Sequence, residues 1–242
     1  MCITMETQSV LINTGNILSS NELKLKVGQN TNEELVEALK ITLKDSQGKN
    51  EALNIINGAD PGSLEDRKEL KITVKIFMPS ADPELLGTAI DQSFKVFDTD
   101  RIETLILAYG EARNTENELE QLQKLWPVVE KYVNAGKICH VGFSNVDADV
   151  FIKLYEWATV RPSIVQINLA TCCVVPPALQ AFTKEHDVQL LTHNDPYQLL
   201  GKDSLADVFG PSVKLQWVVK YQVHVKCRGV LTVKGYLVQC EK

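Results

Sequence analysis

The chain has 242 residues, 44% of them hydrophobic, and a formal net charge of −6 at pH 7. That length is ample for a buried core and close to the roughly 250 residues of one (β/α)8 barrel, so a single domain is expected. Binding to nucleic acid is not expected because Lys and Arg are scattered along an acidic chain, and membrane insertion is not expected because no apolar run approaches roughly 18 residues.

The first part of the chain predicts an irregular start to an α/β fold. Residues 1–9 carry no pattern and are expected to be loose, and 10–12 form a plausible first strand. From 31 to about 43 the pattern is helical, with a capping box at its start and leucines returning on one face. Residues 45–69 are polar and irregular, and only 52–56 could supply a second strand.

The rest of the chain predicts strands that alternate with helices. The expected strands are 71–77, 102–107, 137–145, 165–169, 188–193 and 223–226. The expected helices run from 83 to about 97, from about 116 to 136, over 147–158 and 176–186, and from about 211 to 221. Apolar strands between amphipathic helices are typical of parallel strands joined by crossover helices. We therefore expect an α/β fold of the (β/α)8 barrel type.

The cysteines indicate a reducing environment. They lie at positions 2, 139, 172, 173, 227 and 240, without the spacing of a disulfide scaffold or a C-x-x-C zinc pair. Neither a metal site nor export is expected, and we expect a cytoplasmic protein. Cys172 and Cys173 are adjacent, and Cα atoms about 3.8 Å apart are closer than disulfides usually allow. Either they are a buried side chain beside a loop thiol, or one is an exposed thiol that cross-links to a partner.

Two phrases carry a resemblance to the aldo-keto reductases. G-K-x-x-x-V-G-x-S-N ends at Asn145, and Q-x-N begins at Gln166. In that family the serine, asparagine and glutamine hold the nicotinamide amide, which by position implies roles for Ser144, Asn145 and Gln166. The resemblance further implies that the ring at His193 stacks on nicotinamide. It also implies that the adenosine phosphate is held after the last strand, by Lys226 and Arg228. Residual NADPH binding is thus possible, although no cofactor is expected to be required.

The same family resemblance predicts that the reaction chemistry is missing. Aldo-keto reductases donate a proton from a tyrosine whose pKa a lysine lowers. Lys75 occupies the lysine position, but the first tyrosine of the chain is Tyr109, and Ala108 stands where the family has a histidine. Since side chains alternate along a strand, Tyr109 should face away from the mouth that Ala108 faces. We expect Lys75 to be vestigial and paired with an acidic neighbour.

Longer phrases resemble the regulatory (modifier) subunits of glutamate-cysteine ligase. They include A-T-C-C-V-V-P-P over 170–177 and L-T-H-N-D-P over 191–196, and the likeness is good over about 70–236 and poor over the first sixty residues. It implies a non-catalytic chain that forms a heterodimer with the ligase catalytic subunit, improves its use of glutamate and relieves feedback inhibition by glutathione. The alternatives are an NADPH-dependent reductase of unusual design and an NADPH-binding redox sensor without turnover.

The resemblance also suggests where a partner would bind. Loop residues that match the family without serving local chemistry gather at the expected C-terminal rim of the barrel. They are Cys172, Cys173, Pro176, Pro177, His193, Asn194 and Asp195. The other interpretation is that the prolines and Asp195 only begin or cap helices.

Overall fold

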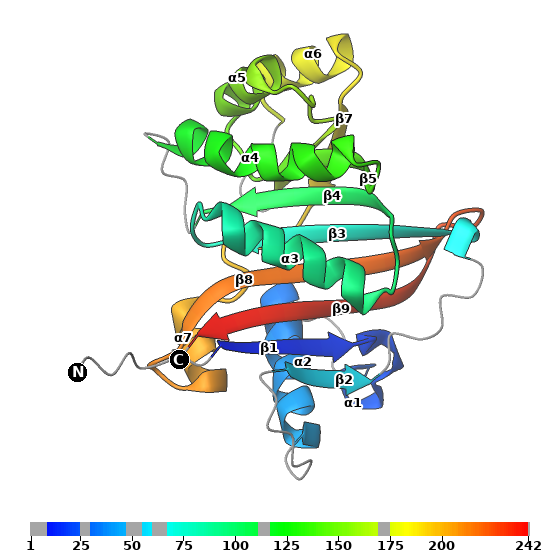
Figure 1. The fold of residues 1–242 in the computed structure, drawn as a ribbon, viewed down its shortest axis with the longest axis vertical. Helices are drawn as coiled ribbons and strands as arrows, with labels where there is room; N and C mark the ends of the chain where they lie inside the picture. The colour runs from blue at the N-terminus through cyan, green and yellow to red at the C-terminus, as the bar shows by residue number, and fades with distance from the viewer. Residues whose placement is uncertain are drawn as a thin grey trace.

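The computed structural model describes residues 9–24, 30–46, 55–59, 67–110, 117–168 and 175–241. Within these ranges the strands form a nine-stranded sheet in the order β2-β1-β9-β8-β3-β4-β5-β6-β7 (Figure 1). The strands are β1 (Ser9–Gly15), β2 (Ile55–Ala59), β3 (Leu70–Met78), β4 (Ile102–Tyr109), β5 (Ile138–Ser144), β6 (Ile164–Asn168), β7 (Gln189–His193), β8 (Lys214–Val225) and β9 (Val230–Glu241). The α-helices are α1 (Asn21–Lys24), α2 (Thr31–Ser46), α3 (Pro83–Val96), α4 (Glu118–Asn134), α5 (Ala148–Trp157), α6 (Pro177–Glu185) and α7 (Lys202–Phe209).

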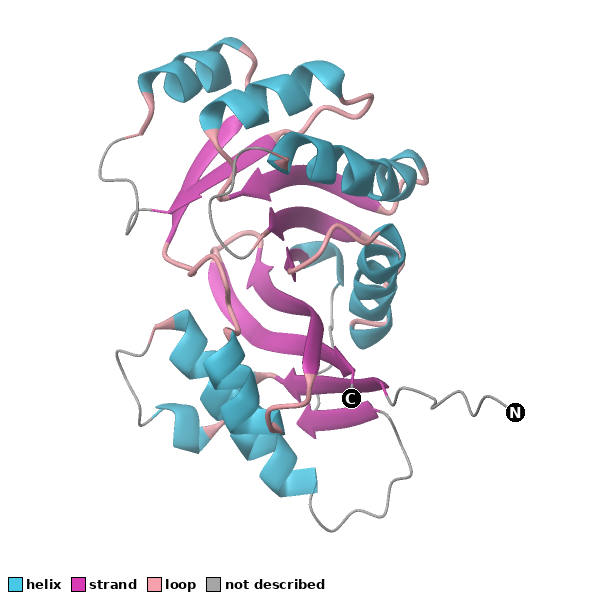
Figure 2. Cartoon of the chain, turned by 90° about the vertical axis from the view of Figure 1, so that its left-hand side faces the viewer, coloured by secondary structure: helices cyan, strands magenta, loops and turns pink. Residues whose placement is uncertain are grey.

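Strands β3 to β7 are parallel neighbours, and α3 to α6 connect them along one face of the sheet (Figure 2). This confirms the predicted α/β fold of strands joined by crossover helices. Local sequence sets the helix starts: the Asp82 carboxylate accepts hydrogen bonds from the backbone N–H groups of Glu84 and Leu85, and Pro83 occupies the first helical position, where no N–H is needed.

The structure from residue 211 onward differs from the prediction. The helix expected over 211–221 is wrong, because these residues enter β8, which pairs antiparallel with β3 and with β9. The segment is rich in β-branched and aromatic residues, and Trp217, Val219, Tyr221 and Val223 alternate into the core on one face. The strand expected over 223–226 is only the end of β8, and β9 was not anticipated.

The β8–β9 hairpin changes the order of the sheet. It lies between β1 and β3, so the described strands depart from a ring of eight parallel neighbours, and β2 and β7 form the two edges among them. Strand β2 pairs parallel with β1, with Leu11 opposite Ile55, and lies slightly later than the predicted 52–56. Residues 1–8 and most of 47–66 lie outside the described ranges.

Two hydrophobic clusters lie on opposite faces of the sheet, because alternate side chains of each strand point to opposite sides. The outer cluster packs α3 to α6 on the parallel strands and contains Val74, Ile76 and the buried Trp126. The inner cluster packs α2 and α7 on β1, β8 and β9, and it also takes Phe77 and Ala108 (Figure 2).

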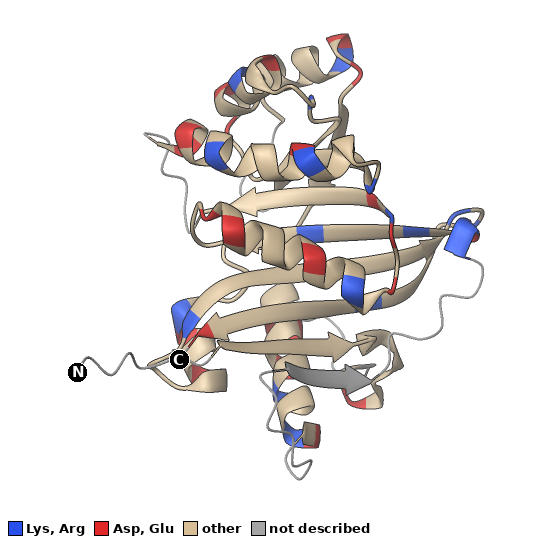
Figure 3. Ribbon diagram, in the orientation of Figure 1, with Lys and Arg blue, Asp and Glu red and all other residues tan. Residues whose placement is uncertain are grey.

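Charged residues of both signs are scattered over the helices, and no element whose side chains are described carries a long basic stripe (Figure 3). None of the helices that the structure describes is long and apolar enough to cross a bilayer.

Candidate functional site

The C-terminal ends of β5, β6 and β7 bring together four of the residues that the sequence singled out. Ser144 pairs in register with Gln166, and Asn168 pairs with His193. The Ser144 hydroxyl lies 2.9 Å from Nε2 of His193, and the backbone N–H of Asn145 donates to the carbonyl of Gln166 at 3.0 Å. The parallel register therefore places these side chains at the C-terminal end of the parallel strands.

Asn145 and Gln166 carry buried polar atoms without a hydrogen-bond partner among the described residues: Nδ2 and Oδ1 of Asn145 and Oε1 of Gln166. Asn145 also has φ of 64°, a left-handed conformation that asparagine tolerates better than most residues. Buried donors and acceptors are costly when unpaired. A primary carboxamide offers both an N–H donor and a C=O acceptor. These orphaned atoms therefore fit the amide of a nicotinamide.

Asp195, which follows β7, is the centre of a buried ion cluster. Its Oδ2 lies 3.0 Å from Nζ of Lys75, and its Oδ1 lies 2.6 Å from Nζ of Lys220 and accepts a 3.0 Å hydrogen bond from Thr31. The Asp195 side chain is only 4% exposed. Burial acts to raise its pKa, but Lys75 and Lys220 outweigh burial and hold the pKa below its usual range. Lys75 thus has the acidic neighbour that the sequence predicted.

Lys220 was not anticipated at this site. The sequence analysis placed it on a helix, whereas the strand β8 puts it directly opposite Lys75. Burial lowers the pKa of Lys75 to about 8, against the opposing effect of Asp195. Strand alternation from Trp217 onward was the signal that could have placed Lys220 on the inner face. With two lysines around one carboxylate, the cluster carries a net positive charge.

His193 links this cluster to Ser144. The backbone N–H of Asp195 donates to Nδ1 of His193 at 3.0 Å, so the proton of the neutral ring sits on Nε2, which donates to the Ser144 hydroxyl. Burial, followed by the nearby Lys75, lowers the pKa of His193 to about 4, so the ring is neutral at pH 7. A serine nucleophile needs a ring nitrogen that accepts its proton. The protonated Nε2 cannot do so, and this is not a hydrolase triad.

Two phenols on the strands around this site, Tyr109 and Tyr236, are unsuited to donate a proton. Tyr109 packs against the outer cluster, whereas Ala108 lies in the inner one, which confirms that the two face opposite ways. Tyr236 lies opposite Lys220 across β8 and β9, but its hydroxyl donates to Glu34, and burial together with Glu34 raises its pKa far above the usual value. Neither phenol has the lowered pKa that proton donation to an alkoxide requires.

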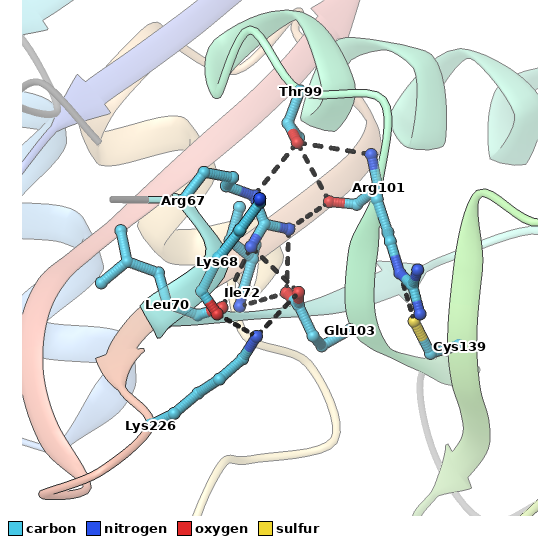
Figure 4. Close-up of polar contacts among 9 residues, drawn as sticks. All are labelled: Arg67, Lys68, Leu70, Ile72, Thr99, Arg101, Glu103, Cys139 and Lys226. Carbon is cyan, nitrogen blue, oxygen red and sulfur yellow. Dashed lines mark hydrogen bonds and ion pairs between the residues drawn. The ribbon is translucent and has the colours of Figure 1, made fainter. Parts of the chain in front are cut away.

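Lys226 and Arg228 do not join the other cofactor positions. Because β8 runs antiparallel to β3, Val225 at its end lies opposite Leu70 at the start of β3, which is the opposite end of the parallel strands. There Lys226 donates to the carbonyl of Lys68 at 2.6 Å and lies 3.9 Å from Glu103 (Figure 4). Arg228 is exposed in the turn that follows. The prediction that these residues hold a phosphate of the same cofactor assumed a parallel last strand, and the structure corrects it.

The residues expected to bind a partner divide into three groups. Cys172 and Cys173 lie outside the described residues. His193 and Asp195 form hydrogen bonds and ion pairs within the chain, and their side chains are buried. Pro177 and Asn194 are exposed, and Pro176 is half-buried. Pro177 begins α6, as the capping interpretation held, but Asp195 binds the two lysines instead.

Comparisons with known proteins show the family of this chain. The aldo/keto reductase family matches residues 29–206. The glutamate–cysteine ligase regulatory subunit of Homo sapiens is 32% identical over 252 aligned residues, covering 96% of this chain and 92% of that protein. A putative glutamate–cysteine ligase regulatory subunit of Schizosaccharomyces pombe is 24% identical and covers 98% of both chains.

The sequence match to a named reductase covers less of the chain. An NAD(P)H-dependent D-xylose reductase of Candida tropicalis is 27% identical over 132 residues, covering 47% of this chain and 41% of the enzyme. A crystal structure of an aldo/keto reductase from Brucella melitensis is 18% identical, with a TM-score of 0.42 over 73% of this chain and 58% of that one. Because the family model matches most of the chain and a ligase regulatory subunit is 32% identical over 96% of it, this chain belongs to the aldo/keto reductase family, among the glutamate–cysteine ligase regulatory subunits.

Proposed function

We propose that this chain is a non-catalytic regulatory subunit that binds the catalytic subunit of a glutamate–cysteine ligase in a heterodimer. In that complex it improves the use of glutamate and weakens feedback inhibition by glutathione. The observation that carries the proposal is the 32% identity to a ligase regulatory subunit along 96% of this chain. A likeness of that extent covers both the parallel strands and the β8–β9 hairpin.

The geometry of the pocket supports a role without reduction of carbonyls. The lysine that a reductase uses to lower a tyrosine pKa is engaged by Asp195, at 3.0 Å. Tyr109 is on the other face of the sheet, and the Tyr236 hydroxyl is held by Glu34. A regulatory effect, in contrast, needs only that this chain bind one conformation of the catalytic subunit more tightly than another. A coupling of about 1 to 3 kcal/mol is typical of such effects.

We place the contact surface at the C-terminal edge of the parallel strands, where Pro177 and Asn194 are exposed. His193 and Asp195 contribute by holding the loop after β7 in place, since the Asp195 backbone carbonyl accepts a 2.7 Å hydrogen bond from Asn168 while its side chain binds the lysines. A substitution of either buried residue would disturb the loop itself, so a loss of binding could not be assigned to a lost contact with the partner.

The sharper test substitutes the exposed residues. In a pull-down with the ligase catalytic subunit, the double variant Pro177→Arg/Asn194→Arg should bind at least about tenfold more weakly than the unaltered chain, because two buried cations at an interface lack partners. The control is Arg228→Glu, which alters an exposed side chain in the turn between β8 and β9. This turn lies at the opposite end of the strands from the proposed surface, so the control variant should bind normally. Normal binding by the folded double variant would refute the surface, and no binding by the unaltered chain would refute the proposed function.

A second candidate is NADPH binding without turnover, which the orphaned atoms of Asn145 and Gln166 favour. Ser144 and His193 lie beside them and would orient the nicotinamide, which supplies hydride chemistry when a reductase binds it. Calorimetric titration with NADPH should show saturable heat that Gln166→Leu diminishes and Lys226→Ala leaves unchanged. The absence of heat at millimolar NADPH would exclude this candidate and leave the ligase proposal untouched.

A further inference from the structure

A second, larger pocket lies at the same end of the parallel strands. It has a volume of about 450 Å³ and is formed where β3 and β4 end, beside α7 and the start of β8. That size falls within the range of small-molecule sites, about 300 to 1,000 Å³. The Lys75–Asp195 cavity is smaller, about 160 Å³, and the residues that line it are all different from those of the larger pocket. The two cavities are neighbours, because Nζ of Lys75, which lines the smaller one, lies 5.3 Å from the centre of the Phe77 ring, which lines the larger one.

The walls of the larger pocket are mostly apolar. They include residues of β3, β4, α7 and β8, and several of these residues belong to the inner hydrophobic cluster. The residues that form them include Phe77, Ala108, Leu199, Leu205, Ala206 and Val218. Ala108 and Ala206 are small residues of this lining, and a larger side chain that points into the pocket from either position would reduce its volume. The apolar walls predict a ligand with a hydrocarbon body.

The charged residues of the lining share one sign. Lys202, at the start of α7, and Lys214, at the start of β8, both line the pocket, and both side chains are exposed. Among the described residues that line it, none is acidic, although the chain as a whole carries a net charge of −6. Two ammonium groups beside an apolar pocket complement a ligand that ends in a carboxylate.

We propose that this pocket binds a medium-chain carboxylate, with its hydrocarbon body against Phe77, Leu205 and Val218 and its carboxylate between Lys202 and Lys214. The backbone at the ends of β3 and β4 fixes one wall, and α7 forms the other. The inference is independent of the ligase proposal, since it rests on the lining of one cavity and not on any relative.

Calorimetric titration of the whole chain with decanoate tests the proposal, with decanol and decylamine as probes of the head group. Decanoate should saturate one site per chain and bind more tightly than either analogue. Ala206→Trp, which fills the pocket from an exposed position on α7, should remove binding of decanoate and decanol alike. Lys202→Gln/Lys214→Gln should weaken decanoate by about fivefold or more and leave decanol unchanged.

A matched control distinguishes the pocket from general attraction to a charged surface. Lys124→Gln removes an exposed lysine from α4, outside the lining, and should bind decanoate as the unaltered chain does. The proposal is overturned if decanoate does not saturate below its micelle concentration, if decylamine binds equally well, or if folded Ala206→Trp keeps full affinity. A circular dichroism melt establishes that each variant is folded.

Discussion

At the scale of single residues, Asp195 holds more of the site together than any other described side chain. It joins Lys75 of β3, Lys220 of β8 and Thr31 of α2, and its backbone is bound by His193 and Asn168. This carboxylate is 4% exposed and keeps its charge because the two lysines together outweigh the effect of burial on its pKa.

Replacing Asp195 should therefore destabilise the chain strongly. Asp195→Asn keeps the size of the side chain but leaves two lysine ammonium groups, with side chains 6% and 13% exposed, without a counter-charge. Removing one partner of a buried ion cluster typically costs about 3 to 5 kcal/mol. Urea unfolding measures the loss.

The exposed pair between Lys40 and Asp207 supplies the control, because its side chains are 45% and 60% exposed. Asp207→Asn should leave the unfolding midpoint nearly unchanged, since exposed ion pairs contribute little. Equal midpoints for the two variants would contradict a structural role for Asp195.

His193 makes stability depend on pH. Its pKa is lowered to about 4 in the folded chain and returns to about 6.5 on unfolding. The unfolded state therefore binds protons first, and the contribution of the neutral ring is complete above pH 6.5 and is lost as pH falls towards 4. At about 1.4 kcal/mol per pKa unit, the loss approaches about 3 kcal/mol.

His193→Gln removes this titration and leaves the other histidines in place. Urea unfolding at a series of pH values between 4 and 7 should show that the unaltered chain loses more stability on acidification than the variant does. Parallel curves for the two chains would show that His193 does not titrate as the structure indicates.

At this scale the sequence predicted well which residues lie together in the site, but it predicted poorly which side chains contact one another. The family phrases located Ser144, Asn145, Gln166 and His193, and parallel register brings these to one edge. Lys75 was expected to pair with an acid, but nothing local to Asp195 shows that a strand more than a hundred residues earlier would supply its lysine. Lys220 was missed because its role depends on β8 being a strand.

At the scale of elements, the β8–β9 hairpin is the feature that distinguishes this chain from a ring of parallel strands. Gly235 of β9 allows the hairpin to pack on β1, because a Cβ atom there would lie 2.2 Å from the Gly15 carbonyl oxygen and 2.3 Å from the Tyr221 hydroxyl. That hydroxyl lies 2.9 Å from both the Gly15 carbonyl and Oδ1 of Asn13.

Gly235→Ala should therefore destabilise the chain, by about 1 to 3 kcal/mol or more, since β1 or Tyr221 must move. Gly87→Ala is the matched control: it adds a methyl group inside α3 where no atom lies within 4 Å. It should raise stability by up to about 1 kcal/mol, because glycine is a poor helix former. Thermal unfolding of both variants measures the difference, and a neutral Gly235→Ala would contradict the close packing of the hairpin.

Element types were predictable where periodicity was clear. The helices α2 to α6 and the strands β3 to β7 follow amphipathic or apolar patterns that local propensity supports. The hairpin was missed because the residues from Lys214 to Val225 carry apolar positions that fit a helix as well as a strand, and only β-branched and aromatic content separates the two. Its place between β1 and β3 is a long-range pairing that no local pattern encodes.

At the scale of the whole molecule, the sheet has a different helix layer on each face (Figure 2). The candidate sites lie at the end where the parallel strands finish. The ion cluster joins the sheet to the inner helix layer, because Lys75 and Lys220 come from adjacent strands and Thr31 comes from α2. A partner that contacts the exposed residues at this end would touch a surface fixed by that cluster.

The kinetics of the ligase test the central claim most directly. The catalytic subunit is assayed with and without an equimolar amount of this chain, across a range of glutamate concentrations and then across a range of glutathione. The account predicts that this chain lowers the KM for glutamate and raises the glutathione concentration needed for half-inhibition, by the roughly fivefold or more that a coupling of about 1 kcal/mol provides. Identical curves with and without the chain, under conditions where the two proteins are shown to be folded, would contradict it.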